Sequence, residues 1–288
     1  MEINFENVSY TYQKNTPFSF QALNQINLTI HSGEFVAIVG HTGSGKSTLL
    51  QHMNGLLIPT EGTVTIGDYQ LSSHGKKQDL KGLRERVGIV FQYPEHQLFE
   101  ETVRKDIAFG PQNFGVPEEE IMIRTNRVMT DVGLDLSILE KSPFELSGGQ
   151  MRRVAIASVL AVQPSVLVLD EPTVGLDPYG QKQMMDLFAH MHKERSLTTV
   201  LVTHKMEDAW KYADRIIVLE QGEKVLEGSP TEIFQNRETL HKNHLELPEM
   251  LLFIDRLNQK LKRKIVYSGQ SIDELAIEVV QQLKDERK

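Results

Sequence analysis

The 288-residue chain has no cysteine, so it can form neither disulfide bonds nor thiolate metal sites. No run of apolar residues approaches the roughly 20 that cross a bilayer, and residues 1–4 lack the basic region and apolar core of a signal peptide. Basic residues are also few: 31 Lys and Arg stand against 39 Asp and Glu, a formal net charge of −8. A general nucleic-acid-binding protein usually has a basic excess, so the composition argues against that class. We expect a protein of a reducing cytosol, in which any membrane role depends on a partner.

What the chain does contain is the pattern G-x-x-x-x-G-K-S at residues 40–47, between an apolar run at residues 35–39 and a helix-forming stretch. Such a strand-to-helix turn presents backbone N–H groups and the positive end of a helix dipole, and it holds polyphosphate. We expect Lys46 to reach the β- and γ-phosphates and Ser47 to give its hydroxyl to Mg²⁺. The predicted phosphate-binding residues are Gly40, His41, Thr42, Gly43, Ser44, Gly45, Lys46, Ser47 and Thr48.

Two acidic residues, Asp170 and Glu171, close a second apolar run at residues 165–169. In a phosphate-loop protein the first acid holds Mg²⁺ through water and the second orients the attacking water. Adjacent strand residues point to opposite sides, which suits two separate tasks. A third apolar run, residues 198–203, ends at His204. His204 is predicted to contact the γ-phosphate or the water, although a lone histidine is more often a satisfied side chain.

Helical patterning replaces short strands between residues 93 and 165, which predicts a helical subdomain inserted into a strand-helix core. Just before it, Gln92 ends a buried strand, where its carbonyl oxygen either binds a metal or water or is solvated. Residues 93–99 are rich in aromatics and form either local packing or a docking surface. Near its end, Ser147 is placed to cap a helix at residues 151–162. Two glycines follow and leave the backbone N–H groups open, so Ser147, Gly148, Gly149 and Gln150 are predicted to form a second anion site.

The two ends of the chain differ in character. Alternating residues 3–8 and 23–30 predict a small antiparallel sheet, with Tyr12 between its strands either stacking on a base or packing. Residues 215–220 and 223–227 predict a closing hairpin. Beyond residue 235, helical spacings at 247–261 and 272–283 and a capping box of Ser271 and Glu274 predict a helical appendage. It has no catalytic motif, and we favour a packing or dimer-stabilising role over a ligand site.

Taken together, the motifs resemble the ATP-binding subunit of the ABC transporters over about residues 1–235. The phosphate loop, Gln92, the Leu-Ser-Gly-Gly-Gln of residues 146–150, the two acids, Asp177 and His204 follow in that family's order, and Leu-Ser-Gly-Gly-Gln is specific to it. The resemblance implies an α/β phosphate-loop core, with a mostly parallel sheet flanked by helices. It also implies an N-terminal antiparallel β subdomain, a helical subdomain at about residues 93–165 and a helical C-terminal appendage at 236–288.

The resemblance further implies a head-to-tail dimer, with ATP and Mg²⁺ between the phosphate loop of one subunit and the Ser147 helix start of the other. The sequence supports this separately, because the chain has two phosphate-binding helix starts but one loop able to enclose a nucleotide. By resemblance, Tyr12 stacks on adenine, and Gln92 links the metal site to a transmembrane partner. Asp177 communicates across the dimer. Glu171 is the general base, and His204 holds the γ-phosphate.

Residues 91–103 and 106–111 resemble a narrower group, the ATPases of energy-coupling factor transporters, and the Tyr-Pro-Glu-His-Gln of residues 93–97 is similar to the second of their two paired types. This implies a heterodimer with a related ATPase, favoured over a homodimer, at the cytoplasmic face of the membrane. It implies docking on a transmembrane coupling protein that works with a membrane substrate-binding protein. Val174 and Gly175 depart from the Ser-Ala common in ABC proteins. The alternatives are an ATPase of another ABC importer class, a soluble ABC ATPase acting on nucleic acid or ribosomes, and a non-hydrolysing sensor.

Overall fold

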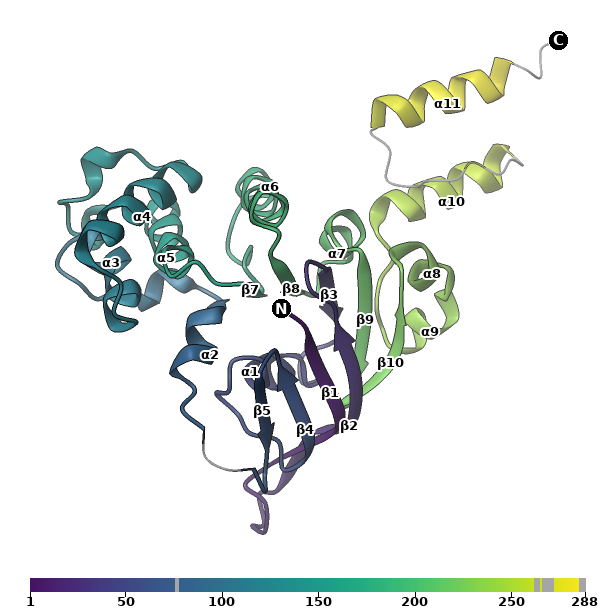
Figure 1. The fold of residues 1–288 in the computed structure, drawn as a ribbon. Helices are drawn as coiled ribbons and strands as arrows, with labels where there is room; N and C mark the ends of the chain where they lie inside the picture. The colour runs from purple at the N-terminus through teal and green to yellow at the C-terminus, as the bar shows by residue number, and fades with distance from the viewer. Residues whose placement is uncertain (76–77, 262–264, 266–271, 285–288) are drawn as a thin grey trace.

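The computed structural model describes residues 1–75, 78–261, 265 and 272–284. A six-stranded sheet in the order β10-β9-β3-β8-β7-β6 forms the centre of the fold (Figure 1). The strands are β3 (Phe35–Val39), β6 (Val87–Val90), β7 (Val166–Asp170), β8 (Thr198–Val202), β9 (Arg215–Glu220) and β10 (Glu223–Gly228). All neighbours pair in parallel except β9 and β10. Every residue of β3 and β8 is buried, which is why both read as unbroken apolar runs. Because the strands are parallel, β3, β7 and β8 end at one edge.

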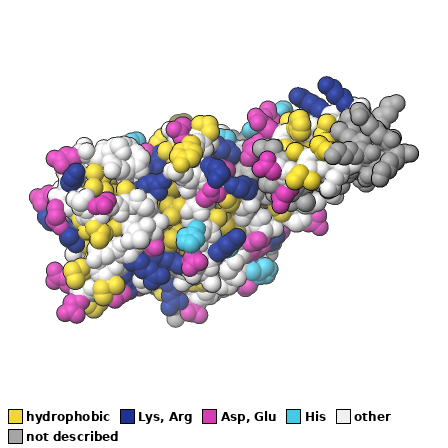
Figure 2. Space-filling model, turned by 90° about the horizontal axis from the view of Figure 1, so that it is seen from above, with side chains coloured by type: hydrophobic (Ala, Val, Ile, Leu, Met, Phe, Trp, Pro, Cys, Tyr) yellow, Lys and Arg dark blue, Asp and Glu magenta, His cyan; other side chains and the backbone are white. Residues whose placement is uncertain are grey.

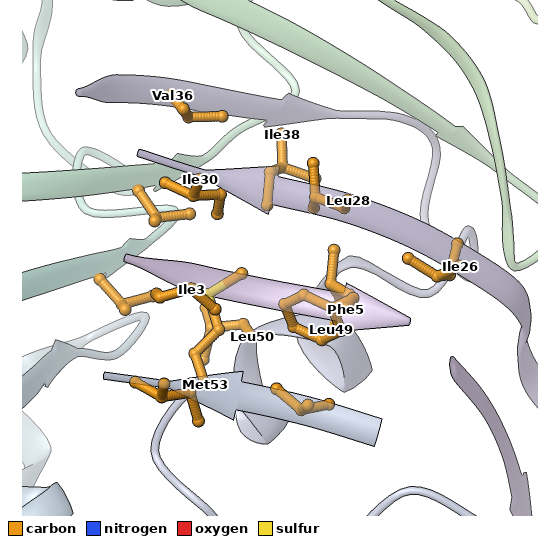
Figure 3. Close-up of a cluster of buried hydrophobic side chains, with 14 of the residues drawn as sticks. Ile3, Phe5, Ile26, Leu28, Ile30, Val36, Ile38, Leu49, Leu50 and Met53 are labelled. Atoms are coloured by element: carbon orange, nitrogen blue, oxygen red, sulfur yellow. The ribbon is translucent and has the colours of Figure 1, made fainter. Parts of the chain in front are cut away.

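A second, antiparallel sheet packs beside the first in the order β2-β1-β4-β5. Its strands are β1 (Ile3–Tyr12), β2 (Phe20–Ile30), β4 (Glu61–Ile66) and β5 (Tyr69–Ser72). Figure 3 shows side chains of β1 and β2 meeting those of β3 and of helix α1 (Lys46–His52) in one buried cluster. This confirms the predicted antiparallel subdomain. The placement of Tyr12 between strands is wrong, because register shifts let the β1–β2 pairing continue to Tyr12 opposite Phe20.

The predicted helical insertion lies between β6 and β7. Helix α2 (Lys81–Arg86) precedes β6 and lies outside the insertion. The insertion itself contains η1 (Pro94–Gln97), α3 (Val103–Asn113), α4 (Glu118–Asp131), η2 (Leu136–Ile138), η3 (Pro143–Glu145) and α5 (Gly148–Ala161). Val103, Val128 and Ile156 share one buried cluster with Leu167 and Leu169 of β7. The insertion is therefore attached to the central sheet through a shared hydrophobic core.

The remaining helices are α6 (Pro178–Arg195), α7 (Met206–Tyr212), α8 (Pro230–Gln235), α9 (Arg237–Lys242), α10 (Glu249–Leu261) and α11 (Ile272–Lys284). Phe234 and Leu240 share a buried cluster with Met206 of α7, whereas Ile254 and Leu275 belong to a smaller separate one. Figure 1 shows α10 and α11 at the end of the molecule opposite the insertion. The predicted capping box with Ser271 lies outside the described residues. The domain boundary at residue 235 stays a prediction.

The surface carries charges of both signs. On the face drawn in Figure 2, acidic and basic side chains are intermingled, with hydrophobic side chains between them. Within the described part of the chain, none of the helices has the length and hydropathy that a membrane span requires.

Candidate nucleotide-binding and hydrolysis site

The phosphate loop joins β3 to α1 in a backbone shape that requires glycine. Gly45 has φ of 101°, and a Cβ there would lie 2.6 Å from the carbonyl oxygen of Ala22. A Cβ on Gly40 would lie 2.2 Å from the carbonyl oxygen of Leu219. The loop is also held from behind, since the Gly222 N–H donates to the Ser44 carbonyl at 3.0 Å. Gly40 and Ser44 therefore build the frame of the loop.

A cavity of about 450 Å³ lies in front of this frame. Its walls are formed by Phe20, Ala22, Thr42, Gly43, Gly45, Lys46, Ser47, Thr48, Gln92, Asp170, Glu171, Val174, Val202 and His204. The strand-end residues predicted from separate parts of the sequence thus meet the phosphate loop in one place. Gly40, His41, Ser44 and Tyr12, although predicted, do not line the cavity.

The Lys46 side chain turns back along the loop. Its ammonium donates to the carbonyl oxygens of Gly40 and His41, each at 2.7 Å. Burial lowers the pKa of Lys46, while the charges of Glu171 and Asp170 act in the opposite direction. With two of its three N–H donors engaged by carbonyls, the ammonium keeps one for an anion in the cavity.

Asp170 and Glu171 occupy different local environments. Asp170 ends β7, and burial raises its pKa, as does the neighbouring charge of Glu171, whereas Lys46 lowers it. Glu171 lies beyond the strand with a left-handed φ of 49°, and its N–H donates to the Val202 carbonyl at 2.9 Å. The expectation that both acids alternate along a strand is wrong for Glu171. The turn after β7, and not the alternation of side chains along a strand, therefore sets the direction of the Glu171 side chain.

His204 follows β8 and lies against Glu171. A carboxylate oxygen of Glu171 is 2.8 Å from His204 Nδ1. Since a carboxylate accepts, Nδ1 carries the proton in this pair. The other ring nitrogen is then available to a ligand in the cavity.

The residues predicted to bind Mg²⁺ fit that ion. Ser47, Gln92 and Asp170 all line the cavity and offer oxygen donors. Among the described residues there is no cluster of three or more His, Cys, Asp or Glu able to hold a metal without other ligands. Mg²⁺ usually binds one or two protein groups together with phosphates and water, so this sparse donor set suits it.

Aromatic residues lie at the edge of the cavity near Thr48. The Tyr12 hydroxyl is 3.2 Å from Thr48 Oγ1, and its ring meets Tyr10 edge-on at 4.8 Å between centroids. Phe20, opposite Tyr12 in the β1–β2 register, is 58% exposed and lines the cavity. Sequence reasoning missed Phe20, together with Ala22, Val174 and Val202. The sequence feature that could have identified Phe20 is its position opposite Tyr12 in the hairpin. That position depends on the length of the loop between β1 and β2.

The second predicted anion site lies at the start of α5, where Ser147 caps the helix as predicted. Ser147 and Gln150 form a capping box, in which the Ser147 N–H donates to Gln150 Oε1 at 3.1 Å and the Gln150 N–H to Ser147 Oγ at 3.4 Å. Space is open around Gly148 and Gly149 within the described structure. These residues do not line the cavity, and neither does Asp177, which caps α6 by accepting from the Gly180 N–H at 2.6 Å.

Comparisons with known proteins agree with this geometry. Residues 23–174 match the ABC transporter family model. The energy-coupling factor transporter ATP-binding protein EcfA2 of Listeria monocytogenes is 53% identical over 97% of both chains, and that of Bacillus thuringiensis is 52% identical over 99% of this chain and 97% of its own.

Solved structures give the same result. The cbiO1 protein of Clostridium perfringens, described as part of the ABC transporter complex cbiONQ, has a TM-score of 0.73 and 38% identity, covering 88% of this chain and 98% of its own. A dimeric ATP-binding cassette in a post-hydrolysis state with ADP and Pi has a TM-score of 0.70 and 33% identity, covering 79% and 98%. The chain belongs to the ABC transporter family and, within it, groups with the ATP-binding proteins of energy-coupling factor transporters.

Proposed function

We propose that this chain is the ATP-hydrolysing subunit of an energy-coupling factor importer and drives uptake of a vitamin or transition-metal ion through transmembrane partners. The observation that carries the proposal is the single cavity in which Lys46, Gln92, Asp170, Glu171 and His204 meet the phosphate loop. The chain works at the cytoplasmic face of the membrane, held there by its partners.

Hydrolysis follows from the positions of the charged groups. The loop N–H groups and Lys46 hold the β- and γ-phosphates. Glu171 accepts a proton from the attacking water as its oxygen bonds to the γ-phosphorus, and the bond to the bridging oxygen breaks to leave ADP. His204 orients Glu171 through Nδ1. Mg²⁺, held by Ser47, Gln92 and Asp170, would neutralise charge on the phosphate oxygens.

The adenine base of ATP binds at the edge of the cavity that carries the aromatic residues. Tyr12 and Phe20 flank this end of the cavity, and stacking on such rings contributes about 1–3 kcal/mol per base. Phe20 offers an exposed ring, whereas Tyr12 is oriented by its hydroxyl contact with Thr48. Both are candidates for the adenine platform.

The second phosphate-binding helix start belongs to a dimer site. Ser147 and the open N–H groups of Gly148 and Gly149 lie outside the cavity of their own chain. In a head-to-tail pair they would face the γ-phosphate bound by the neighbouring subunit. We favour a related ATPase as that neighbour, with Asp177 beside the shared interface.

A transmembrane partner docks in the groove between α3, α5 and β6, beside the end of η1. This groove, of about 290 Å³, is lined by Gln97, Phe109 and Asp106 among others. Phe99, also in its wall, and Phe109 are 59% and 42% exposed and meet edge-on. Asp106 Oδ1 accepts from the Phe99 and Glu100 N–H groups, each at 3.2 Å, while Oδ2 is buried with no hydrogen-bond partner among the described residues. Leu98, which belongs to the predicted docking surface, is 6% exposed and lines the same groove.

The test of the proposed activity is Glu171→Gln in the assembled complex. Turnover should fall by about 10²–10⁴, because the general base is lost, while ATP binding is retained. Glu118→Gln, an exposed carboxylate at the start of α4, is the matched control and should hydrolyse normally. Near-normal turnover of Glu171→Gln would remove the assigned role.

The docking surface has its own test. Phe99→Glu should prevent co-purification of the transmembrane partner while the chain keeps its melting temperature, since Phe99 is exposed. The exposed Ile123→Glu on α4 is the control. Unchanged co-purification of Phe99→Glu would place the partner elsewhere.

A further inference from the structure

We propose that Arg152 is a positioning residue for ATP hydrolysis, acting through a buried clamp that joins α5, η1 and the loop after Glu171. The Arg152 clamp consists of the Arg152 guanidinium, the Glu95 carboxylate and the backbone carbonyl of Val174. None of its members is a catalytic residue. The clamp acts by fixing the segments that carry Ser147, Gln92 and Glu171.

The contacts of the clamp use the full planar fork of the guanidinium. Arg152 Nε and Nη2 donate to the two carboxylate oxygens of Glu95 at 2.9 and 2.8 Å, and Nη1 donates to the Val174 carbonyl at 2.8 Å. The two side chains are 4% and 16% exposed. A lysine, with one compact charge centre, cannot reproduce a bidentate contact and a third bond in this plane.

The electrostatics agree with the geometry. Burial alone would raise the pKa of Glu95, but hydrogen bonds and the charge of Arg152 outweigh it and hold that pKa below its usual value. Removing either partner leaves an uncompensated buried charge on the other. Glu95 and Arg152 are thus bound into one unit.

The clamp connects segments that each carry a site residue. Arg152 lies five residues after Ser147 in α5, Glu95 three after Gln92, and Val174 three after Glu171. The Tyr93 ring reinforces the junction, with the Arg152 guanidinium carbon 5.9 Å from its centroid. A Cβ at Gly175 would come within 3.4 Å of the same ring. A displacement of η1 is therefore transmitted to both α5 and the Glu171 loop.

An ion pair that only stabilised the fold would affect stability and not kcat. Replacing a buried pair by apolar side chains of similar volume is often neutral or stabilising, so stability alone does not require this arrangement. Three hydrogen bonds to two different segments, η1 and the loop after Glu171, fix an orientation, and orientation of reacting groups affects turnover more than ground-state binding. Loss of the clamp should accordingly lower kcat for ATP hydrolysis and leave KM nearly unchanged.

The experiment compares Arg152→Gln with Arg153→Gln in the assembled complex. Arg153 is the next residue of α5, but it donates to the Val132 carbonyl at 2.6 Å and to Gln183 at 3.1 Å, away from the clamp. Arg152→Gln should lower kcat by about 10- to 100-fold with KM changed less than twofold, and Arg153→Gln should leave both near wild type. Equal effects of the two substitutions, or a normal kcat in a folded Arg152→Gln, would overturn the proposal.

Two further variants cover the case in which Arg152→Gln does not fold. Arg152→Lys keeps a charge beside Glu95 and should give a smaller loss of kcat. Glu95→Gln should reproduce the loss, and in the double variant with Arg152→Lys the losses should not add, because one unit is being broken. Additive losses, or a change confined to KM, would refute the clamp. Failure of the Glu171→Gln test would instead refute the assigned catalytic base, whatever Arg152 does.

Discussion

His52 is fully buried at the end of α1, directly behind the phosphate loop. Its Nδ1 lies 2.7 Å from the Thr48 carbonyl, and since a carbonyl only accepts, Nδ1 carries the proton of the neutral ring. Nε2 is buried and has no partner among the described residues. Burial lowers the pKa of His52 to about 4. The helix that follows the phosphate loop thus depends on a histidine remaining uncharged.

We predict that this histidine makes the protein sensitive to acid. Its folded-state pKa lies below the unfolded value of about 6.5, so the unfolded chain binds the proton more readily. The contribution of the neutral ring to the free energy of unfolding is fully present above about pH 6.5 and is lost as pH falls toward 4. The loss approaches about 3 kcal/mol.

The measurement is urea unfolding of the full chain at several pH values. His52→Gln should flatten the decline between about pH 6.5 and 4.5, and the exposed His190→Gln on α6 should not. If the slope is the same in wild type and His52→Gln, the decline originates in other groups.

A second prediction concerns Gly45. A Cβ there meets the Ala22 carbonyl at 2.6 Å and Leu23 Cδ2 at 2.9 Å, in addition to the positive φ. Gly45→Ala should therefore lose ATP binding and destabilise the fold. The matched control is Gly33→Ala, because Gly33 has φ of 77° but open space around it within the described structure, so that only about 1 kcal/mol of backbone strain is expected. Titration of a fluorescent ATP analogue distinguishes them, and equal affinities in both variants would show that the predicted clash at Gly45 does not impair ATP binding.

At the scale of elements, the start of α5 has two separable tasks. The Ser147 hydroxyl caps the helix in this chain, and in the proposed dimer it also contacts the phosphate of the neighbouring subunit. Asp is as good an N-cap as Ser, and its charge is favourable at a helix N-terminus. Ser147→Asp should therefore keep the melting temperature but lower ATP turnover by about 10²-fold, because a carboxylate repels the phosphate.

The chain provides its own control for this prediction at α8. Ser229 and Glu232 form the same kind of capping box outside the cavity. Ser229→Asp should keep both stability and turnover, while Ser147→Ala and Ser229→Ala should each cost about 1 kcal/mol. Normal turnover by Ser147→Asp in the complex would remove Ser147 from the site.

The same elements show how far the sequence determines the site. Continuous apolar runs identified β3, β7 and β8, and since parallel strands end at one edge, Asp170 and His204 could be placed beside the phosphate loop. The direction of Glu171 could not, because it depends on a left-handed φ in the turn. Phe20 and the Glu95–Arg152 contact depend on pairing and on packing between segments distant in sequence, which no local pattern encodes.

At the scale of the whole molecule, the C-terminal segment of residues 240–249 contacts both the phosphate loop and α7. The rings of His244 and His41 meet at 5.8 Å between centroids. The Glu249 N–H at the start of α10 donates to Glu207 Oε1 on α7 at 3.0 Å. Together with the cluster around Leu240, these contacts attach the segment to both the phosphate loop and the helix after His204. The segment near α9 therefore packs against the same core as the phosphate loop.

This arrangement predicts two kinds of response to truncation of a buried leucine. Leu240 and Leu275 are 1% and 3% exposed, so each Leu→Ala change should destabilise its surroundings by about 2–5 kcal/mol. Leu240→Ala should lower the main melting transition, because its cluster includes Met206 and the sheet. Leu275→Ala should leave that transition and its upward shift by ATP unchanged, since its cluster is confined to the appendage. Scanning calorimetry with and without ATP separates the cases, and an equal fall for both variants would mean that α11 unfolds together with the ATP-binding core.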